Sequence, residues 1–212
     1  MKIAILGAEC SGKTTLAKRL ATELTHQGFS ACCVDEALRK WCDTQQRTPH
    51  AKEQFEIAQL QIGHVHSAPA CDYLIADTTA LMTAIYSDVL FNDVSLYSLA
   101  LEDQQQFDWV CVMGLDLPWI ADGIQRDGVT MQAKVDAQLR HILQSQGIAF
   151  SVIYGTGDER LANALAAMAK AQRLAPVTIA RDTPWQWVCD TCSDAQCEHR
   201  IFSALLDAKP AP

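Results

Sequence analysis

The chain has 212 residues, which suits one α/β domain with room for a small appendage, and carries 25 acidic against 17 basic side chains, for a formal net charge of −8. That balance excludes a basic field able to hold nucleic acid by counterion release. No apolar run approaches the roughly 20 residues that cross a bilayer, and no signal-like segment precedes the first strand, so we expect a cytoplasmic protein without membrane contact.

The first predicted elements are an apolar strand over 3–6 and a helix with Leu16, Leu20 and Leu24 on one face. Between them, the sequence Gly7-Ala8-Glu9-Cys10-Ser11-Gly12-Lys13-Thr14 has the spacing of a phosphate-binding loop. In such a loop the glycines turn backbone N–H groups toward phosphate oxygens, and the lysine neutralises the β- and γ-phosphates. The chain is therefore predicted to bind ATP or a related triphosphate, with Mg²⁺ on the Thr14 hydroxyl. The predicted nucleotide-binding residues are Gly7, Ser11, Gly12, Lys13, Thr14 and Thr15.

Four further short apolar runs predict strands over 30–34, 73–76, 109–115 and 150–154. Helical spacing of apolar residues separates them over 50–68, 79–90, 94–106, 131–143 and 161–168. Such alternation indicates a parallel sheet covered on both faces. We therefore expect an α/β fold of the P-loop NTPase type, with a five-stranded parallel sheet, over residues 1–175. Residues 176–212 are expected to form a C-terminal extension.

Carboxylates follow several of these strands. Asp35 and Glu36 end the second strand, Asp77 ends the third and Asp116 follows the fourth. Because ligands of parallel α/β sheets bind outside the carboxyl ends of the strands, we expect these side chains to border one crevice together with Gly7.

The remaining polar residues favour a small-molecule kinase over a GTP switch. No Asn-Lys-x-Asp guanine signature is present, and the loosely similar segment 133–136 falls within a predicted helix. A kinase needs a carboxylate that orients the acceptor hydroxyl and takes its proton, for which Asp35 and Glu36 are candidates. Asp77 is a candidate for supporting Mg²⁺ or the acceptor hydroxyl, or for capping the next helix. Arg126 is either a lid cation over the triphosphate or an exposed loop cation.

A separate cluster lies near the C-terminus. Cys189, Cys192, Cys197 and His199 fall within eleven residues, which is the inventory of a closed structural zinc site. We predict bound Zn²⁺ there. An iron–sulfur cluster and free thiols are the alternatives.

The chain resembles the ribosylnicotinamide kinase domains of NadR-type proteins of NAD biosynthesis. The resemblance covers roughly residues 1–170. Its motifs are the phosphate loop, the Glu-x-x-Arg element at 36–39, Asp77-Thr78, and the Pro-Trp…Asp-Gly…Arg segment at 118–126. It implies ATP-dependent phosphorylation of the ribose 5′-hydroxyl of nicotinamide riboside.

The resemblance also implies roles for individual residues. Glu36 or Asp35 would orient the ribose, and Arg39 would hold the acceptor or a phosphate. Trp119 would stack on the cationic nicotinamide ring, or else plug the core beside Pro118. Asp77 and Asp122 complete the implied acceptor site. The Cys/His tail departs from the family, and so does the start of the chain at the first kinase strand, where full-length NadR-type proteins carry an adenylyltransferase domain.

Two alternatives remain open from the sequence. One is a nucleoside or nucleotide kinase of similar architecture. The other is a non-enzymatic, ATP-binding regulatory module with a zinc-stabilised tail that recruits a partner protein. The expected partners are in every case a nucleotide and small molecules, not nucleic acid; the sequence does not indicate an oligomeric state.

Overall fold

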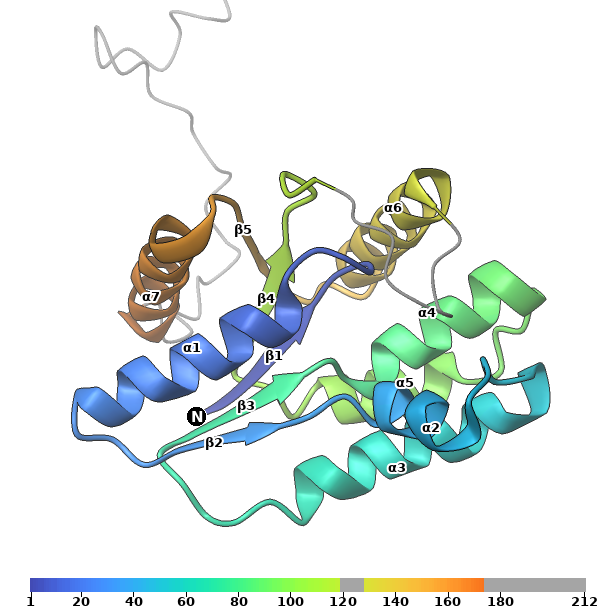
Figure 1. Cartoon of the computed structure of the whole chain (residues 1–212), viewed down its shortest axis with the longest axis horizontal. Coiled ribbons are helices and arrows are strands. Elements are labelled where there is room, and N and C mark those ends of the chain that lie inside the picture. Colours follow the sequence, from blue (N-terminus) through green and yellow to red (C-terminus); the bar gives the residue numbers. More distant parts are fainter. Residues whose placement is uncertain (119–127, 174–212) are drawn as a thin grey trace, which may run out of the picture. The chain divides into compact units, whose positions relative to one another are not determined.

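The alternating apolar runs and amphipathic segments fold into a parallel sheet with helices on both faces (Figure 1). The structure is a computed structural model, and it describes residues 1–118 and 128–173. In chain order its elements are β1 (Lys2–Leu6), α1 (Lys13–His26), β2 (Ala31–Val34), α2 (Ala37–Gln45), the 3₁₀ turn η1 (Ala51–Glu53), α3 (Gln54–His66), β3 (Tyr73–Asp77), α4 (Ala80–Phe91), α5 (Tyr97–Gln104), β4 (Trp109–Met113), α6 (Val129–Ser145), β5 (Ser151–Ile153) and α7 (Gly157–Arg173).

The sheet has the strand order β2-β3-β1-β4-β5, and every neighbouring pair is parallel. The expected five-stranded parallel sheet is thus confirmed. Because β1 lies in the middle, with Ile5 opposite Asp77 of β3 and Cys111 of β4, the loop that follows β1 emerges at the centre of the carboxyl edge. That edge is where the predicted phosphate loop and acidic residues meet.

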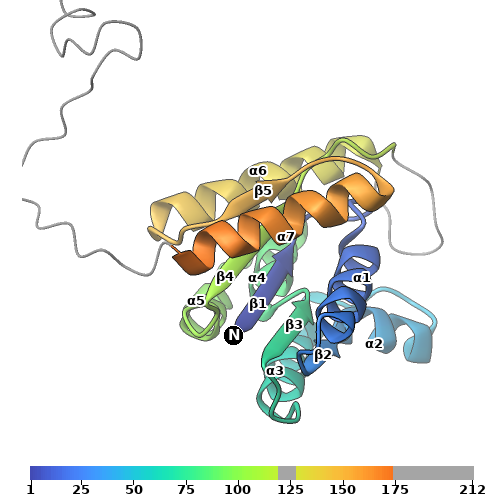
Figure 2. The same cartoon turned by 90° about the vertical axis from the view of Figure 1, so that its left-hand side faces the viewer.

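Side chains of successive strand residues point to opposite faces, so β1 feeds two separate cores. Ile3 and Ile5 pack with α1 and α7 on one face. Ala4 and Leu6 pack with α3, α4, α5 and α6 on the other face. Figure 2 shows α1 and α7 side by side over the first of these faces. The phosphate loop is therefore anchored to a strand that is buried on both sides.

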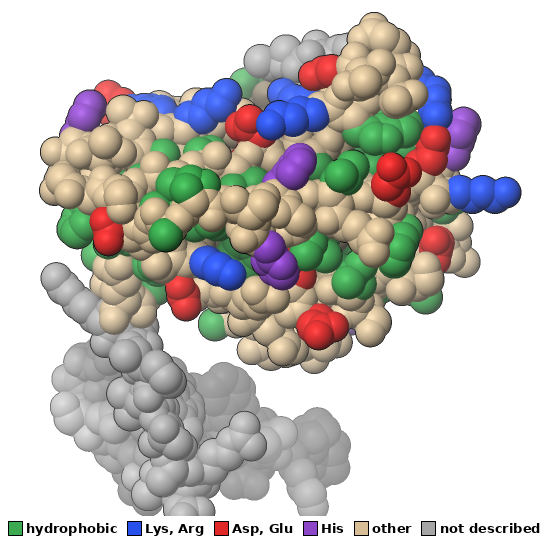
Figure 3. Space-filling view, turned by 90° about the horizontal axis from the view of Figure 1, so that it is seen from below, with side chains coloured by type: hydrophobic (Ala, Val, Ile, Leu, Met, Phe, Trp, Pro, Cys, Tyr) green, Lys and Arg blue, Asp and Glu red, His purple; other side chains and the backbone are tan. Residues whose placement is uncertain are grey.

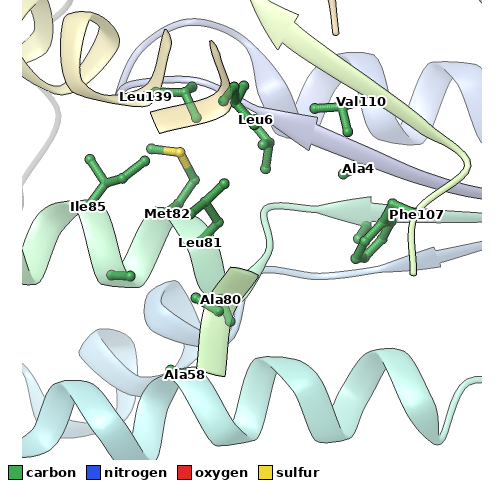
Figure 4. Packing of buried hydrophobic residues seen from close by; sticks show 14 of the residues in the cluster. Ala4, Leu6, Ala58, Ala80, Leu81, Met82, Ile85, Phe107, Val110 and Leu139 are labelled. Carbon is green, nitrogen blue, oxygen red and sulfur yellow. The ribbon is translucent and has the colours of Figure 1, made fainter. Parts of the chain in front are cut away.

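The core between the sheet and α4 is apolar and closely filled (Figure 4). Leu81, Met82 and Ile85 of α4 point toward Leu6 of β1 and Leu139 of α6, and all five are fully or almost fully buried. Burial of aliphatic side chains of this size stabilises the fold by about 1.5–3 kcal/mol each. This packing fixes α4, whose outer turns reach the functional edge of the sheet.

One helix was missed by the sequence analysis. α2 spans Ala37–Gln45, and its apolar residues Ala37, Leu38, Trp41 and Cys42 follow a helical spacing, but this pattern covers little more than one turn before polar residues follow. The predicted helix over 50–68 is a short 3₁₀ turn followed by α3. The other predicted helices and strands are present, and the segment 133–136 lies within α6 as expected.

Residues Met1–Arg173 form one compact unit. The expected domain division near residue 175 stays a prediction, because residues 174–212 lie outside the described part of the chain. Within the described part, none of the helices is sufficiently long and apolar to span a bilayer. The face seen in Figure 3 carries acidic, basic and histidine side chains interspersed with apolar ones, as a solvated surface does.

Candidate functional site

The loop after β1 has the geometry of an anion cradle. Gly7 and Gly12 have φ angles of +153° and +84°, which L side chains rarely adopt. A Cβ on Gly7 would lie 2.9 Å from Ser11 Oγ and from Met113 Cβ. A Cβ on Gly12 would lie 3.1 Å from Leu117 Cδ1. The two glycines are therefore required by space and by backbone conformation, as the phosphate-loop interpretation expects.

Helix α1 begins directly behind this cradle. Its N-cap residue is Gly12, so no side chain caps its first N–H groups and they are available to an anion. Lys13 Nζ donates to the carbonyl of Ala8 at 3.0 Å, which folds the ammonium group over the loop. Ser11 Oγ donates to the same carbonyl at 2.7 Å. Loop N–H groups, helix dipole and lysine thus converge on one site for phosphate.

Arg160 of α7 holds the outer side of the loop. Its guanidinium donates to the carbonyls of Ser11 at 2.5 Å and Gly155 at 2.6 Å, and it forms an ion pair with Asp116. Asp116 in turn accepts from the N–H of Gly155 at 2.6 Å. Asp116, which we expected at the crevice, is therefore part of an anchor that joins the loop to the ends of β4 and β5.

A cleft of about 1230 Å³ opens beside the loop. One wall is the loop itself, and the other is formed mainly by α2 and the outer turns of α4. Glu36 and Arg39 line this second wall, with Glu36 Oε2 3.7 Å from Arg39 Nε. The predicted nucleotide-binding residues Ser11, Gly12, Lys13, Thr14 and Thr15 line the first. The cleft thus brings the predicted phosphate site and two predicted acceptor residues together.

The Glu36 carboxyl is 14% exposed, and its surroundings perturb its pKa. Burial raises the pKa of Glu36 above its ordinary value, and the nearby Asp77 carboxylate raises it further. Lys13 and Arg39 oppose this shift. A carboxylate in this setting binds a proton more readily than a solvated one, which is the property that a general base needs.

Asp77 and Thr78 lie at the buried end of β3. Asp77 is 2% exposed, and its Oδ1 and the Thr78 hydroxyl have no hydrogen-bond partner among the described residues. Thr78 also has a φ of +81°, a strained conformation for a β-branched residue. Helix α4 is capped by Thr79, whose hydroxyl accepts from the N–H of Leu81, so the capping role considered for Asp77 is not needed.

Gln61 of α3 links the two acidic positions. Its Oε1 accepts from the N–H of Ala37 at 2.7 Å, at the start of α2, and its Nε2 donates to the carbonyl of Thr78 at 3.2 Å. The side chain is buried. The Gln61 side-chain amide therefore fixes Ala37, which follows Glu36, and Thr78, which follows Asp77.

Glu9 connects the loop to the opposite wall. Its Oε2 accepts from the Tyr86 hydroxyl of α4 at 2.7 Å, and its backbone carbonyl accepts from Gln132 Nε2 of α6 at 2.8 Å. Both Glu9 and Tyr86 line the cleft.

Four residues with contacts at the site were not predicted from the sequence: Glu9, Gln61, Tyr86 and Arg160. An acidic side chain inside an anion-binding loop was a signal for Glu9, while the other three become visible only through their contacts. Asp35, in contrast, lies outside the set of cleft-lining residues. Its carboxylate pairs with Lys40 at 3.1 Å and is half exposed.

Several predicted site residues lie outside the described part of the chain. They are Trp119, Asp122 and Arg126 and the four proposed zinc ligands Cys189, Cys192, Cys197 and His199. Over residues 1–118 and 128–173, no group of three or more His, Cys, Asp or Glu side chains could hold a metal ion. The zinc site therefore stays a prediction.

The described residues fit Mg²⁺ bound with a nucleotide. A hard cation takes hydroxyl and carboxylate oxygens and keeps several waters of its own. Thr14 lines the cleft, whereas Asp77 and Thr78 lie outside the set of cleft-lining residues. The Asp77 Oδ1 and the Thr78 hydroxyl are buried and partnerless oxygens at the same edge of the sheet. These groups are the ones that would hold the ion.

Comparisons with known proteins agree with this fold. A structure described as NadR protein in complex with NAD and AMP-PNP matches 82% of this chain with a TM-score of 0.66 and 17% identity. A NadR complex with NR matches 80% with a TM-score of 0.63 and 18% identity. The chain spans only about half of these two proteins, covering 49% and 50% of their lengths.

A deoxyadenosine kinase from M. mycoides, with the products dCMP and dCDP bound, matches 80% of this chain with a TM-score of 0.57 and 16% identity. Here the match covers 100% of the other chain. No curated protein matches the sequence. At these identities the structural likeness shows the fold alone, which is of the P-loop NTPase type. The family described as AAA domain matches residues 2–160, three quarters of the sequence, and the chain belongs to that family.

Proposed function

We propose that the protein is an ATP-dependent small-molecule kinase that transfers the γ-phosphoryl group to a hydroxyl. The observation that carries this proposal is the shared cleft, in which the phosphate loop with Lys13 faces the partly buried Glu36. A loop that only senses ATP does not need a carboxylate of raised pKa on the facing wall. Phosphoryl transfer does, because the attacking hydroxyl must lose its proton.

In the proposed reaction the acceptor oxygen attacks the γ-phosphorus, the bond from that phosphorus to the β,γ-bridging oxygen breaks, and ADP leaves. The hydroxyl proton passes to Glu36. Lys13 and the loop N–H groups stabilise charge on the phosphoryl oxygens. Mg²⁺, when bound, neutralises the β- and γ-phosphates and orients them. Thr14 and Asp77 are the residues that would hold the ion, directly or through its waters.

The leading acceptor is the ribose 5′-hydroxyl of nicotinamide riboside, as the motif resemblance implies. Support comes from the fold shared with NadR and from the acidic side chains Glu9 and Glu36, which line the cleft and suit a cationic ring. Ordinary nucleosides are the second candidate. The deoxyadenosine kinase likeness favours them, since its whole chain is matched.

The test is incubation with ATP-Mg²⁺ and a mixture of nucleosides that contains nicotinamide riboside, followed by mass spectrometry. We expect one compound, nicotinamide riboside, to gain a phosphoryl group. Lys13→Ala should abolish the product, while Lys18→Ala, an exposed lysine on the same helix, should not. Folded protein that phosphorylates nothing in the mixture would contradict the kinase proposal, and phosphorylation of a different nucleoside would replace the acceptor.

A further inference from the structure

Glu9 poses a physical problem for a phosphate-binding loop. The loop is built to attract anions, and a carboxylate within it repels the triphosphate unless its side chain is directed elsewhere. The structure directs it across the cleft to α4, where its Oε2 accepts from the Tyr86 hydroxyl at 2.7 Å. The donor loop therefore places an acidic group at the acceptor wall.

Glu9 is held from two sides, but its carboxylate is only half satisfied. Gln132 fixes its backbone carbonyl, and Tyr86 fixes Oε2. Oε1 is sealed from solvent and has no hydrogen-bond partner among the described residues. Leaving a buried acceptor unpaired costs about 1–3 kcal/mol, and more when the group is charged. Such exceptions are uncommon in folded proteins and need a reason.

Tyr86 cannot relieve this deficit, because its hydroxyl has one proton and gives it to Oε2. Burial raises the pKa of Tyr86, and the carboxylates of Glu9 and Glu36 raise it further. The hydroxyl therefore stays protonated and continues to donate. Tyr86 and the proposed base Glu36 line the same cleft.

We propose that Glu9 is a specificity-determining residue of the acceptor site, and that binding of the phosphoryl acceptor opens access to Oε1, which then accepts a hydrogen bond from a second hydroxyl of that compound. The inference rests on the proposed kinase function and deepens it. The acceptor class is a sugar or sugar-bearing compound with at least one hydroxyl besides the one that is phosphorylated. For a nucleoside, the ribose form is accepted and a deoxy form that lacks the contacting hydroxyl is rejected.

The experiment compares nicotinamide riboside with its 2′-deoxy and 3′-deoxy analogues. Each is tested for kcat/KM with ATP-Mg²⁺ and for binding by calorimetry. The proteins are wild type, Glu9→Met, Glu9→Gln and the control Glu102→Gln, an exposed glutamate on α5. Methionine keeps the length of the side chain but accepts no comparable hydrogen bond, whereas glutamine keeps a neutral one. Thermal melting and ATP binding establish that each variant is folded.

We expect wild type and Glu102→Gln to prefer the riboside over at least one deoxy analogue by about 10- to 100-fold, the range of a charge-assisted hydrogen bond. Glu9→Met should lose that preference by losing activity and affinity for the riboside. Glu9→Gln should keep part of it. A preference that survives intact in Glu9→Met would overturn the inference.

The two proposals fail differently. If wild type phosphorylates the riboside and both deoxy analogues equally well, the kinase stands and the role of Glu9 falls. If wild type phosphorylates none of them, the leading acceptor falls, and the binding data decide the inference on their own. Equal affinity of wild type and Glu9→Met, or no binding at all, overturns it.

Discussion

The two walls of the cleft are assembled differently. The phosphate wall comes from consecutive residues, Gly7 to Thr14, and works mainly through backbone N–H groups and one lysine. The acceptor wall is assembled from separate helices and works through side chains, with Glu36 and Arg39 at α2 and Tyr86 on α4. A binding site formed by the backbone of consecutive residues can be recognised in the sequence as a short motif. A site assembled from side chains of separate helices cannot. The phosphate wall is therefore built from a motif that many proteins can share, whereas the side chains of the opposite wall are particular to this protein.

The largest expected effect tests the acceptor wall. Glu36→Gln should lower kcat by about 10²- to 10⁴-fold, because the attacking hydroxyl loses its proton acceptor, while ATP affinity is retained. Asp35→Asn, at the neighbouring residue that pairs with Lys40, should keep nearly the wild-type rate. Steady-state kinetics with varied ATP and acceptor check this. Equal losses in both variants would mean that Asp35 shares the role of base.

The next effect tests the anchor of the phosphate wall. Arg160→Gln should lower the free energy of unfolding by about 2–4 kcal/mol, since the Asp116 carboxylate and the carbonyls of Ser11 and Gly155 lose a buried charged partner. It should also raise KM for ATP. Urea denaturation and ATP kinetics measure the two changes.

Arg140→Gln is the matched control for this anchor. Arg140 also pairs with an aspartate, Asp136, but the pair lies four residues apart on α6. Removing it should cost only about 0.5 kcal/mol and leave KM for ATP unchanged. If Arg160→Gln and Arg140→Gln lowered the free energy of unfolding by similar amounts, the contacts of Arg160 with the loop would add nothing to stability.

The same contrast explains what could be predicted from the sequence. The strands were recognised because each is a continuous apolar run, and the phosphate loop because its residues are contiguous. Helix α2 was missed because its apolar pattern, made by Ala37, Leu38, Trp41 and Cys42, covers little more than one helical turn. Asp35 and Glu36 could not be ranked, since only the folded chain shows that Glu36 turns into the cleft and Asp35 pairs with Lys40. Arg160 was not recognised because two of its three partners, Ser11 and Asp116, come from distant segments.

A smaller effect tests how the acceptor wall is positioned. Gln61→Leu leaves the N–H of Ala37 and the carbonyl of Thr78 without their partner, which should cost about 1–3 kcal/mol of stability. Because this misplaces Glu36, kcat should fall on the order of tenfold with little change in KM for ATP. Gln104→Leu is the control, since Gln104 is equally buried but accepts from the capping Thr79 hydroxyl. It should lose stability without a comparable loss of kcat.

The smallest expected effect concerns pH. Glu36 must be ionised to accept a proton, so kcat/KM should fall as the pH drops through its pKa. Burial and Asp77 raise that pKa above the ordinary value of 4.5, so the acidic limb should lie at a higher pH than for a solvated glutamate. The raised pKa has a counterpart in stability. The folded state holds the proton more tightly than the unfolded state, so stability falls as the pH rises from the ordinary to the raised value. Glu36→Gln should remove this slope and be the more stable protein at neutral pH.

Substitution of Arg39 tests whether Glu36 is the group that titrates in this pH profile. Its guanidinium lowers the pKa of Glu36, so Arg39→Gln should move the acidic limb of kcat/KM to higher pH. The shift should be small, because Arg39 is 53% exposed and solvent screens its charge. Lys40→Gln removes the same charge one residue later, but Lys40 pairs with Asp35 and should leave the limb in place. The position of the limb is independent of any loss in acceptor affinity, which changes only the height of the profile. A limb that moves equally in both variants would reflect the overall charge of α2, and a limb that ignores Arg39 would indicate that Glu36 is not the group that titrates.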